Sequence, residues 1–307
     1  MAYKFYKGDT PLIQQPRLGN SLLGRAYVGN ELAYGAAAGF DPTLGGTLSP
    51  YYWFDFTDSS TMVFSSGVNI STITSKGSNT GNLSARSNQT TNPTYQTTYS
   101  SFAGGSGANS GLQILDSSLP AELNNDDFTI ILLANVDMSQ ANSLNNRPLS
   151  YIVPSGTMTS PVQWDIFPAY DTIPNFPQTK NIDTGVQGNP ANTPNMYGGY
   201  YNAADYYNHK NFTNGTTETG WNAMMLRYTA STKKQEFGLA LDSSNLLEMN
   251  SVMQTYESST GTGLTLGARA LSSQTDGADM DVAHLIYYGS KLTDTNIDDI
   301  LGGFTAP

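Results

Sequence analysis

Hydrophobic and polar residues alternate in short runs along most of the chain, which is typical of half-buried β-strands. Residues 68–73 alternate strictly, and apolar runs at residues 51–56, 112–115 and 264–268 are bounded by loops rich in Gly, Ser and Asn. Residues 128–136 form a continuous apolar run. Its β-branched content and its length favour a strand in the core of a sandwich over a helix. The pattern therefore predicts an all-β fold.

The last third of the chain predicts further strands. Residues 221–228 and 236–242 are expected to pair across a turn at residues 231–234, and residues 280–288 form the last strong strand. The three tryptophans occupy strand positions, where we expect them to be buried in the core; they are Trp53, Trp164 and Trp221.

Residues 139–218 differ from the rest because they contain many prolines and a tyrosine cluster from Tyr197 to Tyr207. A structureless loop of this length would be unusual in a compact domain. We therefore expect short strands around residues 151–153 and 162–166, with elaborated surface loops between them.

One short helix is predicted near the C-terminus. Thr293 is a candidate N-cap, and Asp294 suits the first turn of a helix because of the helix dipole. The apolar residues Ile297, Ile300 and Leu301 fall on one face, and two glycines end the helix.

Residues 1–47 differ from the rest because Pro and Gly interrupt their short apolar runs. We interpret them as an arm with a linker. Two short strands flank Gly29-Asn30, a dipeptide suited to a tight turn. A lone hairpin is marginal in water, so we expect it to dock on a partner protein or on the arms of other subunits. The alternative is that it packs on its own domain. The candidate docking residues are Tyr27, Val28, Leu32 and Tyr34. The rest of the chain, residues 48–307, is predicted to form one β-sandwich.

Charge and composition exclude some classes of function and of binding site. The 307 residues include 14 Lys and Arg against 25 Asp and Glu, which gives a net charge of −11, and only 13% of residues are charged. Such a surface repels phosphate backbones and argues against nucleic-acid binding. There is no cysteine, so disulfides and thiolate metal sites are excluded. We expect neither a Sec-type leader nor a membrane span, because the chain has no sufficiently long apolar run.

Several short motifs follow one another along residues 48–307. They are Trp53-Phe54-Asp55, Ser66-Gly67-Val68, Asn92-Pro93-Thr94-Tyr95, Phe128-Thr129-Ile130-Ile131, Trp221-Asn222, Gly267-Ala268-Arg269, Gly277-Ala278-Asp279-Met280-Asp281 and Leu292-Thr293-Asp294. Taken in order, they resemble the concanavalin A-like lectin/glucanase superfamily, and within it the laminin-G-like jelly rolls. The resemblance implies a jelly-roll β-sandwich, here with an N-terminal β-arm and one short C-terminal helix.

Residues 1–35 resemble the short β-arms that begin many virion proteins of tailed phages, and residues 25–35 look like their recurring element of two strands joined by a turn of glycine and a polar residue. An arm joined to a jelly roll suggests a component of a bacteriophage virion, such as a tail fibre, a baseplate protein or a capsid-decoration protein, assembled in the host cytoplasm. Such a protein would contact other virion proteins through the arm, and we expect a homo-oligomer, with a trimer favoured.

Catalysis is not expected. Glucanases of this superfamily carry a Glu-x-Asp-x-x-Glu strand, which is absent here, and the six glutamates are scattered. The nearest constellation is Asp279-x-Asp281, which is expected to be a solvated start of a strand. With Asp276, these aspartates could also supply oxygen ligands to calcium, which laminin-G-like domains often bind. His284 lies among apolar residues and is expected to be a packed histidine rather than a catalytic base.

The tyrosine cluster is the expected functional surface. Its candidate ligand-binding residues are Tyr197, Tyr200, Tyr201, Asp205, Tyr206 and Tyr207. Aromatic rings stack on sugars while polar side chains bind the hydroxyls, yet the same residues serve equally well as anchors of a protein interface. The sequence therefore leaves two functions open: a virion structural protein, or an adhesin that recognises host surface glycans.

Overall fold

A computed structural model of the chain describes two parts, the arm and the sandwich. In the arm it describes six short strands between residues 6 and 34. Beyond the arm it describes residues 40–86, 89–104, 110–114, 126–136, 149–152, 162–170, 181–182, 194–202, 205–211, 220–232, 234–248, 263–268 and 277–307.

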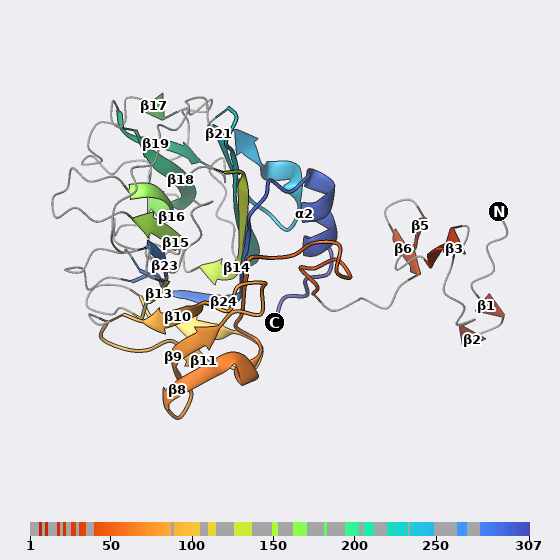
Figure 1. Cartoon of the computed structure of the whole chain (residues 1–307), viewed down its shortest axis with the longest axis horizontal. Coiled ribbons are helices and arrows are strands. Elements are labelled where there is room, and N and C mark those ends of the chain that lie inside the picture. Colours follow the sequence, from red (N-terminus) through yellow and green to blue (C-terminus); the bar gives the residue numbers. More distant parts are fainter. Residues whose placement is uncertain are drawn as a thin grey trace.

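The arm strands pair as three separate two-stranded hairpins, which lie to one side of the sandwich in Figure 1. The strands are β1 (Tyr6–Lys7), β2 (Thr10–Pro11), β3 (Arg17–Leu18), β4 (Ser21–Leu22), β5 (Ala26–Val28) and β6 (Glu31–Tyr34). In the third hairpin Val28 lies opposite Glu31, with two residues between them. This is the predicted hairpin around Gly29-Asn30.

The remaining strands form an all-β jelly-roll sandwich, as the sequence predicted. The layer that carries the helix, here called the helix-side sheet, contains β7 (Tyr52–Asp55), β12 (Ser100–Phe102), β14 (Phe128–Val136), β20 (Trp221–Thr229), β21 (Lys234–Leu239), β22 (Leu247–Glu248) and β24 (Met280–Tyr288). The strand β14 lies at its centre, between β20 and β24, and all these pairs are antiparallel. The predicted pair at residues 221–242 is thus confirmed as β20 and β21.

The second layer, here called the far sheet, curls over the first (Figure 1). Its strands are β8 (Met62–Ser66), β9 (Asn69–Thr74), β10 (Asn82–Ala85), β11 (Thr94–Tyr95), β13 (Leu112–Ile114), β15 (Leu149–Ile152), β16 (Val162–Tyr170), β17 (Asn181–Ile182), β18 (Pro194–Asn202), β19 (Asp205–Asn211) and β23 (Gly263–Leu266). The short strand β11 pairs with both β12 and β9 and so joins the two layers.

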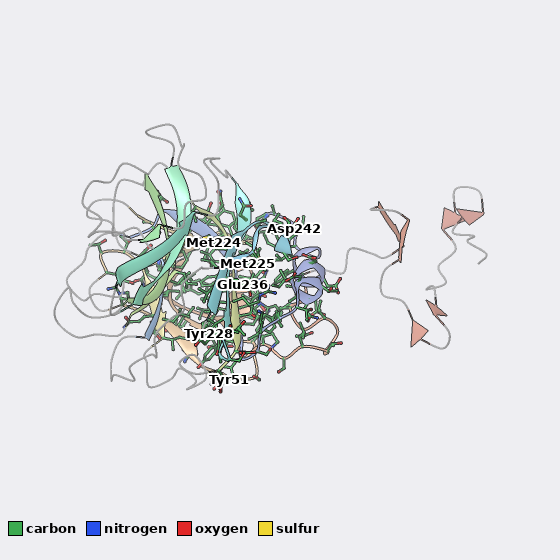
Figure 2. The ribbon with its side chains drawn as sticks, turned by 90° about the horizontal axis from the view of Figure 1, so that it is seen from above. Tyr51, Met224, Met225, Tyr228, Glu236 and Asp242 are labelled. Carbon is green, nitrogen blue, oxygen red and sulfur yellow. The ribbon has the colours of Figure 1, made fainter. Side chains whose placement is uncertain are left out.

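Two apolar clusters lie on opposite faces of the helix-side sheet. Consecutive residues of β20 show the division: Met224 faces the cluster between the sheets, and Met225 faces the cluster under the helix (Figure 2). The strand β14 divides in the same way, with Ile130 in the first cluster and Ile131 in the second. Burial of both faces explains why residues 128–136 are apolar throughout instead of alternating.

The helix α2 (Asp294–Leu301) covers the outer cluster. The Thr293 side chain accepts a hydrogen bond from the Asn296 backbone as the predicted N-cap. The three apolar residues predicted on one face are all buried; they are Ile297, Ile300 and Leu301. Two single-turn 3₁₀ helices, η1 (Ser59–Thr61) and η4 (Ser243–Asn245), lie in connections. Within the described residues, no helix has the length and apolar content needed to cross a bilayer.

Candidate functional site

A β-bulge shapes the outer face of the helix-side sheet. Leu133 of β14 lies opposite His284, whereas the next residue, Ala134, lies opposite Val282. The intervening Ala283 is the extra residue of a bulge, so Ala283 and His284 both face outward. His284 is therefore directed away from the core between the sheets, although it is only 5% exposed.

His284 lies against two polar side chains of β7. Its Nδ1 is 3.3 Å from Asp55 Oδ1 and 3.4 Å from Trp53 Nε1. Nδ1 can donate to Asp55 or accept from Trp53, but it cannot do both in one tautomer. Burial, reinforced by the positive charge of Lys76, lowers the pKa of His284 to about 4 in spite of Asp55. The imidazole is accordingly neutral at pH 7.

Asp55 is held as a carboxylate by several donors. Lys76 Nζ lies 2.7 Å from Oδ2, while the Thr57 backbone N–H and hydroxyl donate to Oδ1 at 3.0 and 2.6 Å. Burial opposes ionisation, but His284, Lys76 and Thr57 outweigh it and lower the pKa of Asp55. Lys76 also pairs with Asp58 at 2.6 Å. Hydrogen bonds from Lys76 and Ser60 lower the pKa of Asp58 to about 2.

Two phenylalanines from opposite ends of the chain cover this polar cluster. The Phe40 ring stacks on His284, with centroids 4.2 Å apart and planes 15° apart. Phe304 meets Phe40 edge-on at 6.0 Å and lies 6.4 Å from His284. A histidine that is 5% exposed, with one ring stacked on it and a second ring edge-on beside it, has no free approach for a substrate. The cluster therefore anchors structure and is not suited to proton transfer.

Residues 40–48, which begin with Phe40, pack on the outer face of the helix-side sheet. The Tyr288 hydroxyl donates to the Pro42 carbonyl at 2.8 Å, and burial raises the pKa of Tyr288. The Asp41 carboxylate accepts from the backbone N–H groups of Thr43 and Gly45. We call residues 40–48 together with Phe304 the clamp. The sequence assigned most of this segment to the linker, and the structure packs it on the sandwich.

Replacing Phe304 by alanine is expected to loosen the clamp. The substitution removes the ring that covers Phe40, and we expect it to cost about 1–2 kcal/mol of apolar burial. Cleavage by chymotrypsin between residues 40 and 48 should become several-fold faster. Leu241→Ala is the matched control, because Leu241 is 40% exposed and lies on a different segment. Equal cleavage rates in the two variants would show that Phe304 does not hold the clamp.

The structure places the predicted tyrosine cluster on strands. Tyr197, Tyr200 and Tyr201 belong to β18, and Asp205, Tyr206 and Tyr207 belong to β19. The expectation of surface loops here was therefore wrong, because tyrosine favours strands and the two segments pair with each other. The side chains of this cluster are outside the described part of the structure, so their role as a binding surface stays a prediction.

The structure describes two of the three aspartates proposed for calcium. Asp276 lies outside the described residues, and Asp279 is exposed and precedes β24. Asp281 lies within β24, where its Oδ1 accepts a hydrogen bond from the Ser101 hydroxyl at 2.7 Å. Within the described ranges, no three metal-ligating side chains come together. A calcium site formed with Asp276 stays a prediction.

The predicted docking residues of the arm lie on the third hairpin. Tyr27 is opposite Leu32, Val28 is opposite Glu31, and Tyr34 is opposite Ala26. Their side chains lie outside the described part, so partner docking is untested by the structure.

The cluster of Asp55, Lys76 and His284 was not predicted from the sequence. Its one local signal was a charged residue directly after two aromatic residues in the first strand.

Comparisons with known proteins identify the fold. No family model matches the sequence, and no curated protein matches it. The sialidase of Trypanosoma rangeli in complex with 2,3-difluoro-KDN is similar in structure, with a TM-score of 0.51 and 10% identity over 82% of this chain and 32% of that chain. This chain thus spans about a third of the sialidase's length. At this identity the likeness shows an all-β jelly-roll fold and no more.

Two further structures are similar at lower scores. The binding domain of botulinum neurotoxin serotype D has a TM-score of 0.49 and 9% identity, over 83% of this chain and 52% of that chain. The Ruminococcus gnavus IT-sialidase CBM40 bound to α2,3-sialyllactose has a TM-score of 0.45 and 9% identity, over 66% of this chain and 96% of that chain.

Proposed function

We propose that this chain is an assembly protein of a tailed-phage virion, in which the arm docks on a neighbouring protein and the jelly roll is presented outward. The clamp is the observation that carries this proposal. It seats the segment that follows the arm on the sandwich through Phe40 on His284 and through Pro42 on Tyr288. An arm that leaves from a fixed point can set the orientation of the whole domain on a particle.

The proposed role is binding and not catalysis, and it includes a homo-oligomer, with a trimer favoured. The three arm hairpins support this part of the proposal. Each pairs only within itself among the described residues. Isolated two-stranded hairpins gain stability when they pack on other chains.

Removing residues 1–39 is expected to abolish assembly while leaving the sandwich folded. The clamp begins at Phe40, so the truncated chain keeps every described contact of the jelly roll. Light scattering should show a smaller oligomer than the full chain forms, and the truncated protein should not enter particles. Circular dichroism and thermal melting serve as the control for folding. A full-length protein that is a stable monomer, unchanged by the deletion, would contradict the proposal.

Glycan recognition by the tyrosine strands is the second candidate function. The register of β16 and β18 sets Trp164 opposite Tyr200 and Phe167 opposite Tyr197. Each pair shares one face of the sheet, and the two pairs lie on opposite faces because residues 164 and 167 are three positions apart. Each face therefore carries one pair of aromatic positions of the kind that stack on sugars. A glycan array probed with the full chain in the presence of calcium tests this candidate. The absence of any bound glycan would remove it.

A further inference from the structure

A second face of the sandwich carries a constellation suited to sugars, away from the tyrosine strands. Four residues follow one another across four neighbouring strands of the helix-side sheet. Trp221 of β20 lies opposite Asn135 of β14, Asn135 lies opposite Asp281 of β24, and Asp281 lies opposite Ser101 of β12. We call these four residues the cross-strand row.

The cross-strand row faces the helix side and is half-buried. Alternation along β14 gives its direction: Leu133 belongs to the outer cluster and Ala134 to the core between the sheets, so Asn135 points outward. The row is adjacent to the clamp, since the Trp221 ring lies 6.0 Å from Phe304. All four side chains are partly accessible, unlike His284.

A strained turn brings a second aromatic ring to the row. The rings of Tyr99 and Trp221 are 5.8 Å apart and inclined by 69°. Thr97, two residues before Tyr99, has a φ of 75°, which is rare for a β-branched residue and costs on the order of 1–3 kcal/mol. The Tyr95 hydroxyl holds the turn by donating to the Thr97 carbonyl, and the Gln96 backbone N–H donates to the Tyr99 carbonyl.

Several polar groups in the row are open to a ligand. Asp281 uses Oδ1 to accept from Ser101. Within the described chain, Asp281 Oδ2, the Asn135 amide, Trp221 Nε1 and the Tyr99 hydroxyl make no hydrogen bond. Two aromatic rings beside a carboxylate and an amide are what a pyranose requires, since its apolar face stacks on rings and its hydroxyls bond to oxygen and amide groups.

We propose that the cross-strand row and Tyr99 form a binding site for a neutral hexose. The charge of the site selects against acidic sugars. None of its five residues is basic, Asp281 contributes a carboxylate, and the chain carries a net charge of −11. A sialic or uronic acid would place its carboxylate near Asp281, and none of the five residues of the site supplies a cation to balance it. The inference rests on glycan binding, the second proposed function, but assigns it to a different face.

Calorimetric titration of the full chain tests the site. The probes are maltotriose, cellotriose, mannotriose and galactotriose as neutral sugars, and sialyllactose as the acidic one. At least one neutral trisaccharide should bind, and sialyllactose should bind at least about ten-fold more weakly. Asn135→Ala and Tyr99→Ala should each weaken the neutral sugar about ten-fold, through a lost hydrogen bond and a lost ring contact.

Asn222→Ala is the matched control. Asn222 is the same residue type and neighbours Trp221, but its amide donates to the Gly220 carbonyl. The affinity of this variant should equal that of the unaltered chain. Failure of every neutral trisaccharide to bind, binding of sialyllactose alone, or unchanged affinity in both test variants would overturn the site. Asn135→Ala should still assemble normally, so loss of the sugar site and failure of the assembly role can be told apart.

Discussion

Replacing Arg227 by alanine is expected to lower the free energy of unfolding by about 3–5 kcal/mol. Arg227 lies on β20, and its side chain is only 7% exposed. Its Nε and one terminal nitrogen donate to the two carboxylate oxygens of Glu236 on β21, at 2.8 and 2.6 Å. The other terminal nitrogen donates to the Leu292 carbonyl and to Asp294 at the start of α2, at 2.9 and 2.6 Å. One guanidinium thus joins two strands to the helix.

The loss of stability in Arg227→Ala arises mainly from Glu236, which remains without its partner. Glu236, labelled in Figure 2, is 15% exposed, and the variant would leave it with Lys291 at 3.0 Å as its remaining cation in the described part. A carboxylate that is largely buried and loses its bidentate partner is destabilising. Burial opposes the ionisation of Glu236, yet Arg227 and Lys291 lower its pKa, so the carboxylate stays charged at neutral pH.

Asp294→Asn provides the control within the same network. The Asp294 side chain is 65% exposed, so its pair with Arg227 is screened by water and should contribute less than about 1 kcal/mol. Unfolding in guanidinium chloride, extrapolated to water, measures both variants. Similar losses in Arg227→Ala and Asp294→Asn would show that the network does not depend on the buried pair.

The layers of the fold could be predicted from residue patterns because each pattern has a local cause. The apolar run at residues 128–136 predicted a core strand, and β14 is buried on both faces. The N-cap at Thr293 and the apolar face of the helix were correct for the same reason. The tyrosine segment was expected to lie in the surface loops of the proline-rich residues 139–218, whereas residues 197–207 fall in β18 and β19, which pair with each other.

The candidate sites depend on register, which short motifs do not encode. The cross-strand row brings together residues 101, 135, 221 and 281, and no spacing along the chain relates them. His284 faces outward together with Ile286 and Tyr288, and the bulge at Ala283 breaks the alternation between His284 and Val282, which faces the core between the sheets. Trp53 and Trp221 were expected in the core, yet both are half-buried on the outer face of the helix-side sheet. Trp53 lies beside His284, and Trp221 belongs to the cross-strand row. A strand pattern shows that a side chain alternates but not what lies beside it.

Lowering the pH from about 6.5 to about 4 is expected to reduce the free energy of unfolding by about 2–3 kcal/mol through His284 alone. Burial lowers the pKa of His284 from 6.5 to about 4 in the folded protein. Above pH 6.5 neither state binds the proton. Between the two values the unfolded chain binds it and the folded chain does not, so unfolding becomes more favourable. Below about 4 both states bind it and the loss is complete.

The carboxylates near His284 act in a lower window. Asp41, Asp55 and Asp58 all have lowered pKa values, so the stability that they contribute is lost only below their usual value of 3.8. Chemical unfolding at pH 7.5, 6 and 5 therefore reports mainly the histidine, because the usual pKa of Glu236, 4.5, also lies below this range. His284→Gln should flatten the dependence over this range, while His209→Gln should leave it in place, since the chain has 2 histidines. An unchanged slope in His284→Gln would mean that the proton enters elsewhere. Loss of the pH dependence in His284→Gln would show that His284, on which the Phe40 ring stacks, is the group whose protonation destabilises the fold.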